Sequence, residues 1–395
     1  MPFRIAMVAA CPVPARRGTP LRVERLVEAL CAQGHQVELI TYHVTEDDTT
    51  LDFPVHRLFD KRIRREMPAG PSARKLFLYD PLLAMKVWQV VGRGGFDVIH
   101  AHHFEGLLAA MPARLRHRIP LVYDAHTMLR LELPSYGPRL SHWLARTAGG
   151  WLDGTLPRGA DHIVAVTPDI RDTLIERHGL SPERVTVVMN GVETGTFRVE
   201  DAPSLDGAVR LIYSGTLAPY QDIDLLLEAF ARARRVRKDL RLCFSVSSPF
   251  EPYEEQARSL GIRDSIDVIA DGFEELPGRL AASDIAVLPR TACPGIPQKL
   301  LNYMAAGKAI VSSAGSAKVI EHERTGLIVP NGDAEAFAEA LLRLADDPGL
   351  ARELGDRARV DVESTYTWEQ AADTLQGIYE QVTLRHKGLG SPERV

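Results

Sequence analysis

The chain has 395 residues, of which 45% are hydrophobic and 25% are charged, and its formal net charge is −5. This composition is typical of a globular protein of two or three domains and excludes a disordered or fibrous chain. No apolar run approaches the roughly 20 residues that cross a bilayer. The balance of charges also lacks the strong basic stripe of a nucleic-acid-binding protein.

The first ten residues are largely apolar, but they lead into Cys11 and a polar loop without a small-residue cleavage site. We therefore expect a core strand of a cytoplasmic protein in place of a secretion signal. The cysteines are scattered without a CxxC spacing, which favours free thiols over a disulfide framework or a zinc site. The cysteines are Cys11, Cys31, Cys243 and Cys293.

Short apolar runs alternate with runs of helical periodicity along the chain, a pattern typical of parallel sheets covered by helices on both faces. A first series of strands is predicted at 4–10, 37–42, 96–103, 119–126, 161–166 and 185–189. A second series of strands is predicted at 209–215, 240–246, 265–269, 284–288 and 309–312. Late helices are predicted at 333–346, 349–363 and 367–385.

These two series predict an α/β protein with two doubly wound, Rossmann-like domains, at 1–191 and 209–366. Residues 192–208 lack periodicity and are interpreted as a linker. A C-terminal helix covers 367–386, and the polar residues 387–395 are expected to fray. Ligands of such sheets bind at the carboxyl ends of strands, so we expect the site in a cleft between the domains.

The loop after the first strand offers a candidate anion site. Gly18 lets the backbone approach a ligand, and the helix that begins near Thr19 presents free N–H groups and a positive dipole end. Arg16 and Arg17 add positive charge. The alternative is an ordinary strand-to-helix loop with a proline in the first helical turn.

Histidines end two consecutive strands of the first series. Strand alternation places His100 and His102 on one face, followed by His103. We favour histidines at the rim of the sheet, without metal, over a zinc site, because no carboxylate or cysteine stands near them in obvious ligand spacing. His126 ends the next strand and is the better candidate for contacting a substrate.

Asp222 and Asp224 match a short D-x-D pattern that can bind metal. They also open a predicted helix, where aspartate caps free N–H groups. We favour the capping role.

The segment from 289 to 315 is a second Gly/Pro-rich loop before a helix at the carboxyl end of a strand. Lys299 stands in the first turn of that helix, where a cation opposes the helix dipole. A bound anion would explain this lysine, and a side chain that extends into solvent is the alternative.

Taken together, the residues resemble the family-4 retaining glycosyltransferases of GT-B fold, over nearly the whole chain. Each motif is weak alone, whereas their order and spacing together are specific. The motifs are GHQV at 34–37, DVIHAH at 97–102, VMNGV at 188–192, SGTL at 214–217, LLLEA at 225–229, YMAAGK at 303–308 and TGLIVPNGD at 325–333.

The resemblance implies a nucleotide-sugar donor held mainly by the second domain and an acceptor held mainly by the first. It implies transfer with retention, no obligatory metal and no cofactor beyond the nucleotide sugar as co-substrate. The diphosphate would then meet the Gly18 loop and residues 295–299, and His126 would contact the transferred sugar. The helix at 367–386 would cross back to the first domain.

Four positions depart from the family pattern. Thr216 and Gln221 stand where the family usually has an arginine and a lysine that hold the diphosphate. Pro294 and Asn302 stand at two glutamate positions, of which Asn302 can still bind a ribose hydroxyl. Lys299 and His126 are the two expected catalytic residues, and Lys299 is the cation of the two. The expected donor-binding residues are Gly18, Gly215, Thr216, Gln221, Arg290, Gly295, Ile296, Pro297, Gln298 and Asn302.

Residues 57–77 combine basic and apolar side chains. Family members that act on lipid-linked acceptors dock on membranes through such a face, and each basic residue near an anionic surface contributes about 1 kcal/mol. Peripheral contact with the inner face of the membrane is therefore one expectation, and a solvated loop is the other.

The sequence thus predicts a glycosyltransferase that builds a polysaccharide or glycolipid from a nucleotide sugar, without binding nucleic acid. A scaffold that kept the fold and lost donor chemistry is the second hypothesis, motivated by Thr216 and Gln221. A sugar-nucleotide epimerase is disfavoured, because the acidic residues that it needs are not obvious near the cleft.

Overall fold

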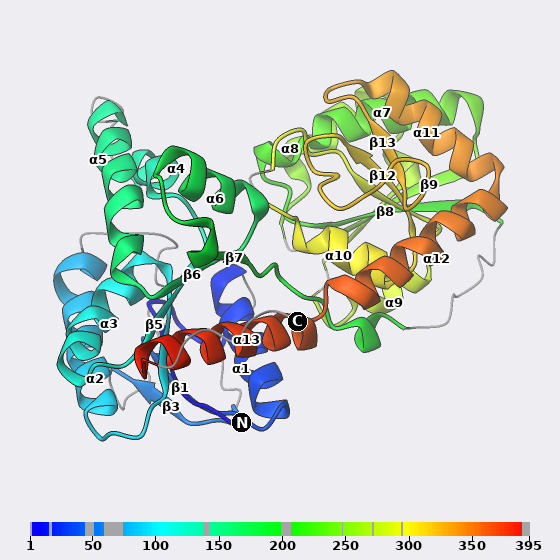
Figure 1. Cartoon of the computed structure of the whole chain (residues 1–395). Helices are drawn as coiled ribbons and strands as arrows, with labels where there is room; N and C mark the ends of the chain where they lie inside the picture. The colour runs from blue at the N-terminus through cyan, green and yellow to red at the C-terminus, as the bar shows by residue number, and fades with distance from the viewer. Residues whose placement is uncertain are drawn as a thin grey trace. The chain divides into compact units, whose positions relative to one another are not determined.

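The computed structural model divides the chain into two compact units (Figure 1). Unit 1 comprises Met1–Met189 and Trp368–Val395, and unit 2 comprises Asn190–Thr367. Each unit is built around one parallel sheet, which confirms the predicted α/β class with two Rossmann-like sheets. The structure describes residues 2–15, 18–43, 51–58, 74–136, 142–198, 207–246, 248–270, 272–293 and 295–388.

Unit 1 contains, within the described residues, a seven-stranded sheet of order β3-β2-β1-β4-β5-β6-β7. Its central strands β4 and β5 are buried along their whole length, as expected for strands covered on both faces. The strand order reverses between β1 and β4, so residues that follow these strands gather at a topological switch point. The strands are β1 (Arg4–Ala9), β2 (Gln36–Thr41), β3 (Val55–Arg57), β4 (Val98–His102), β5 (Leu121–Ala125), β6 (His162–Ala165) and β7 (Val185–Val187).

Helices cover both faces of this sheet. Apolar residues of α2 and α3 pack on one face, and those of α1 and α13 pack on the other. Helix α13 comes from the C-terminal end of the chain and lies against α1, as Figure 1 shows in red and blue. The helices are α1 (Gly18–Ala32), α2 (Asp80–Val91), α3 (His103–His117), α4 (Leu129–Glu132), α5 (His142–Thr155), α6 (Pro168–Asp172) and α13 (Trp368–His386).

Unit 2 contains, in the part that the structure describes, a six-stranded parallel sheet of order β10-β9-β8-β11-β12-β13. Here the strand order reverses between β8 and β11, which identifies the loops after these two strands as the ones nearest the switch point. The strands are β8 (Val209–Gly215), β9 (Leu240–Val246), β10 (Ile266–Ile269), β11 (Ile285–Leu288), β12 (Ala309–Ser313) and β13 (Leu327–Val329).

The helices of unit 2 also divide between the two faces of its sheet. The apolar residues of α7, α8 and α11 pack into one cluster, and the apolar residues of α9, α10 and α12 pack into the other. The helices are α7 (Ile223–Val236), α8 (Glu251–Ser259), α9 (Leu276–Ala281), α10 (Gln298–Ala305), α11 (Ala334–Asp346) and α12 (Pro348–Thr365).

Several sequence predictions concern the regions that join these elements. The described start of the predicted linker belongs to unit 2, where a short turn at Thr194–Phe197 buries Phe197. Residues 199–206 of that linker, 59–73 of the basic segment and 389–395 of the tail lie outside the described residues. The four cysteines are free and half-buried. No helix among the described residues is long and apolar enough to cross a membrane.

Candidate active site

A buried ion pair lies beneath the switch point of unit 1. Arg22 of α1 donates from Nε (3.1 Å) and from a terminal nitrogen (2.9 Å) to Oδ2 of Asp124 in β5. Both side chains are at most 2% exposed. A further Arg22 hydrogen bond reaches the carbonyl oxygen of Val188 at 2.8 Å. Burial opposes ionisation of Asp124, but Arg22 and the nearby imidazoles hold its pKa well below the usual range.

Two histidines of β4 surround this carboxylate. The rings of His100 and His102 stack with centroids 4.6 Å apart, which confirms that they share a face. Their nearest ring nitrogens are 3.6 Å and 3.5 Å from Asp124 Oδ2. The prediction of rim histidines without a neighbouring carboxylate is wrong, because both rings are fully buried and the sheet aligns β4 beside β5. His100 Nδ1 also lies 2.6 Å from the hydroxyl of Tyr379 in α13.

His126 follows β5 and connects the buried cluster to the loop after β1. Its Nε2 lies 3.0 Å from His102 Nδ1, and its Nδ1 lies 3.3 Å from the hydroxyl of Thr19. The His103 ring stacks on it at 4.6 Å. Burial lowers the pKa of His126 well below its usual value, and His103 and Arg22 add to this effect, although Asp124 opposes it. A neutral imidazole follows, suited to hydrogen bonding with a hydroxyl group.

Gly18 begins α1 in a left-handed conformation with φ +27°. Among the described residues, a Cβ built there would meet nothing within 4 Å. The first turn carries no acidic residue that would occupy its free N–H groups. This geometry suits an anion. Arg16 and Arg17, the predicted basic residues of this loop, lie outside the described residues.

Lys299 provides the central cation of unit 2. It stands in the first turn of α10, and its Nζ donates to the hydroxyl of Tyr213 (2.9 Å) and to Oε1 of Gln221 (3.3 Å). The same Nζ lies 4.0 Å from the Tyr213 ring centroid. The alternative of a lysine extended into solvent is therefore wrong. Burial, reinforced by the positive charge of Arg290, lowers the pKa of Lys299 to about 7.

The end of β8 lies directly beside this lysine. Gly215 has φ +114°, and a Cβ at that position would be 3.0 Å from Lys299 Nζ. Only glycine therefore combines this conformation with the close approach of the ammonium group. The Tyr213 hydroxyl donates to the carbonyl oxygen of Thr216 at 2.7 Å, so the three groups form a hydrogen-bonded chain from the lysine to the loop. The Thr216 residue itself is exposed.

Asp222 anchors the loop that follows β11. Its Oδ2 accepts from the backbone N–H of Thr291 (2.6 Å) and from the Thr291 hydroxyl (2.7 Å). Asp222 precedes α7 with φ +54°, and its side chain makes no capping hydrogen bond. The predicted capping role is therefore wrong, because the carboxylate is committed to the neighbouring loop. Asp224 is exposed on α7.

The remaining predicted donor residues line the approach to α10. Arg290 lies over the exposed ring of Tyr220 at 4.8 Å and donates from Nε to the carbonyl oxygen of Ala292. Gln298 donates from Nε2 to the carbonyl oxygen of Gly191 (2.9 Å), a structural contact. Gly295, Ile296 and Pro297 are half-buried before the helix, and Pro294 lies outside the described residues.

Asn302, one turn further along α10, is 3% exposed. Within the described part of the chain, its Oδ1 has no hydrogen-bond partner. A buried carbonyl oxygen without a partner costs free energy, so this atom is available to a donor group.

Comparisons with known proteins identify the family of this chain. The family described as Glycosyltransferase Family 4 matches residues 17–196, and the family described as Glycosyl transferases group 1 matches residues 208–347. The chain belongs to the family-4 glycosyltransferases. A D-inositol 3-phosphate glycosyltransferase of Kribbella flavida is 28% identical to it over 318 residues, covering 73% of this chain and 72% of that protein.

Solved structures show the same GT-B fold as this glycosyltransferase. A sucrose-phosphate synthase from Thermosynechococcus elongatus superposes with a TM-score of 0.78 at 19% identity, covering 97% of this chain and 100% of that one. Anabaena HepE, solved with UDP and glucose, superposes with a TM-score of 0.71 at 16% identity, covering 96% and 99% of the two chains.

Four residues of the candidate site were not predicted from the sequence of this glycosyltransferase. Arg22, Asp124, Tyr213 and Tyr379 stand inside helices and strands, where the residue pattern marks them only as core positions. A charged residue within an otherwise apolar strand, such as Asp124 in β5, was the available signal, because a buried charge requires a partner.

Glu105, in the first turn of α3, is a further buried acid, and burial raises its pKa to about 7.

Proposed function

We propose that this glycosyltransferase moves a sugar from a nucleotide-sugar donor to a glycan or lipid-linked acceptor, with retention and without a metal ion. The observation that carries the proposal is the position of Lys299, whose ammonium group lies beside Gly215 at the end of β8, near the switch point of unit 2. A cation there can stabilise the charge that develops on a departing diphosphate.

UDP is the first nucleotide to test, since Anabaena HepE was solved with UDP. In unit 2, Lys299 and the N–H groups before α10 would hold the diphosphate, with Arg290 adding charge. The unpaired Oδ1 of Asn302 would accept from a ribose hydroxyl. In unit 1, the N–H groups at the start of α1 beside Gly18 would contact an anionic group, and His126 would hydrogen-bond the transferred sugar.

We propose metal independence because the side chains that could bind a metal ion already have other partners. His100, His102 and Asp124 lie close enough to hold a metal ion. The guanidinium group of Arg22, however, donates twice to the same carboxylate oxygen, and a second cation there would be repelled. We therefore propose that this cluster orients His126.

The rival hypothesis is a scaffold without donor chemistry, motivated by Thr216 and Gln221. Lys299 argues against it, because its ammonium group lies 3.3 Å from the Gln221 side chain and restores a positive charge at that position. Peripheral membrane contact through 57–77 is supported by the described end of that segment, where Leu76 and Phe77 are exposed.

The deciding experiment is a thermal-shift panel of nucleoside diphosphates and nucleotide sugars in the presence of a chelator. A ligand at 100 times its Kd stabilises the fold by about 2.7 kcal/mol. We expect a shift that is selective for one base and unaffected by the chelator. No shift with any nucleotide would favour the scaffold. With the donor identified, proton NMR of the first product reports the anomeric configuration, and inversion would contradict retention.

A further inference from the structure

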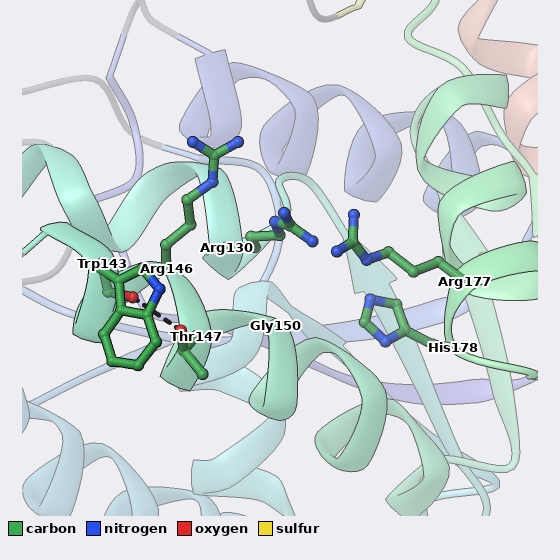
Figure 2. Close-up of a pocket in the computed structure, with 7 residues that line it drawn as sticks. All are labelled: Arg130, Trp143, Arg146, Thr147, Gly150, Arg177 and His178. Carbon is green, nitrogen blue, oxygen red and sulfur yellow. Dashed lines mark hydrogen bonds between the residues drawn. The ribbon is translucent and has the colours of Figure 1, made fainter.

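Unit 1 contains a pocket of about 440 Å³ that the proposed chemistry does not use (Figure 2). It is formed by α4, α5 and the end of the helical segment η5 (Thr173–Arg177). The residues that line it are Arg130, Trp143, Arg146, Thr147, Gly150, Arg177 and His178.

Helix α5 is attached to the unit through small and polar residues. A Cβ on Gly149 would lie 2.6 Å from the carbonyl oxygen of Leu129, so glycine permits the close contact of α5 with α4. Asp153 accepts from the backbone N–H groups of Leu129 (2.8 Å) and Arg130 (2.9 Å). The Asp153 carboxylate is thus committed to the backbone of α4, the helix that carries Arg130.

The pocket carries three guanidinium groups and no acidic lining residue among those described. Figure 2 shows the side chains of Arg130 and Arg177 pointing toward one another. Within the described residues, none of the three guanidinium groups is paired with a carboxylate. Like charges that face each other repel, and an anion bound between them would offset this repulsion. Burial lowers the pKa of His178, and Arg177 adds to this despite the opposing charge of Asp153, so the arginines supply the charge.

We propose that this pocket binds a phosphate group of the acceptor. Guanidinium groups match phosphate oxygens with two parallel hydrogen bonds. The indole ring of Trp143, which is 73% exposed, offers an apolar wall to the organic part of the same ligand. The ligand class is therefore a phosphorylated polyol or sugar, or the phosphate of a lipid headgroup.

The position of the pocket fits an acceptor site. This step rests on the proposed function, in which His126 contacts the transferred sugar. Arg130 follows His126 by only four residues, so their Cα atoms are at most about 14 Å apart. A phosphate at Arg130 would leave the hydroxyl groups of a small polyol within reach of the His126 side of the unit.

The test measures binding by calorimetry with the full chain. The probes are inositol 3-phosphate, inositol as its phosphate-free match, and vesicles of phosphatidylcholine with or without phosphatidylglycerol. The variants are Arg130→Gln combined with Arg177→Gln, and Gly150→Asp, which places a carboxylate in the pocket. Arg116→Gln, on the exposed face of α3, lowers the net charge by one away from the pocket and so matches the charge change of Gly150→Asp.

We expect the phosphate-bearing probe to bind and inositol not to bind measurably. Both pocket variants should weaken that binding about tenfold or more, and Arg116→Gln should leave it unchanged. Binding of the soluble probe identifies a phosphorylated polyol, whereas binding only to anionic vesicles identifies a lipid phosphate. Equal binding of inositol and its phosphate, or pocket variants that bind like the wild type, would overturn the proposal.

Binding of UDP separates this proposal from the proposed function. The pocket variants should keep the wild-type affinity for UDP, because Lys299 and its neighbours are untouched. A chain that binds UDP but shows no pocket-dependent phosphate binding retains the proposed function and loses the acceptor-phosphate site. A chain that binds no nucleotide loses the proposed function, while the phosphate measurement still decides whether the pocket binds anions.

Discussion

The ammonium group of Lys299 lies 3.3 Å from the side-chain oxygen of Gln221, a residue 78 positions earlier in the chain. A lysine from the first turn of α10 thus reaches the position at which the family pattern leads one to expect a lysine after β8. The Tyr213 hydroxyl, 2.9 Å from the same ammonium group, holds it there. The positive charge that Gln221 does not provide is supplied from another helix.

Removing this charge should weaken donor binding. Lys299→Met is expected to lower the affinity for UDP about tenfold or more, since a hydrogen bond to a charged group contributes about 1.5–3 kcal/mol. Isothermal calorimetry with UDP measures the change. Lys238→Met, which removes an exposed lysine of the same unit, is the matched control. Equal affinities of the two variants would contradict the role of Lys299.

Donor binding should also depend on pH. With a pKa of about 7, Lys299 is mostly neutral at pH 8 and mostly charged at pH 6. A diphosphate beside it favours the charged form, so binding at pH 8 takes up a proton. The apparent affinity for UDP-glucose, whose diphosphate does not titrate near neutrality, should rise about tenfold from pH 8 to pH 6.

Calorimetry in two buffers of different ionisation enthalpy reports that proton uptake directly. The Lys299→Met variant should lose both the proton uptake and the pH dependence, while Lys238→Met should retain them. A wild-type affinity that is constant between pH 6 and pH 8 would argue against a titrating Lys299.

The Arg22–Asp124 pair should matter strongly for stability. Arg22→Met leaves Asp124 as an uncompensated buried charge, which is expected to cost about 3–5 kcal/mol in the free energy of unfolding measured with urea. The control is Arg25→Met, which breaks a partly exposed pair with Glu28 and should cost at most about 1 kcal/mol. Combining Arg22→Met with Asp124→Leu should recover part of the loss, and a double variant no more stable than the single one would count against the charge explanation.

Glu105 should make stability depend on pH in a defined direction. Burial raises its pKa from about 4.5 to about 7, with Asp80 adding to the effect, so the fold favours the protonated acid. The stability that this preference contributes is complete below pH 4.5 and is lost as the pH rises through 7. The loss is at most about 3 kcal/mol.

Glu105→Gln cannot ionise and should therefore gain stability relative to the wild type between pH 5 and pH 8. Urea unfolding at both pH values measures the difference between the two proteins. A difference that does not change with pH would mean that Glu105 ionises normally in the fold.

Local pattern was sufficient for most of the fold. The strands predicted at 209–215 and 240–246 have those bounds in the structure, because an apolar run between turn-forming residues is a local property. The three-residue strands β3 and β13 escaped prediction, whereas the equally short β7 was predicted because an apolar run continues past it to Met189. The motifs likewise led to the family, because their order and spacing are recorded along the chain.

The chemistry of the candidate site depended on contacts between distant segments. The sequence by itself determined that Lys299 begins a helix, that His126 ends a strand and that His100 and His102 share a face. Only the tertiary structure decided that Lys299 meets Tyr213 and Gln221, and that Asp124 lies between Arg22 and the histidines. The physical reason is that strand order in a parallel sheet brings together loops far apart in the chain, and burial then determines which charged groups must pair and which change their pKa.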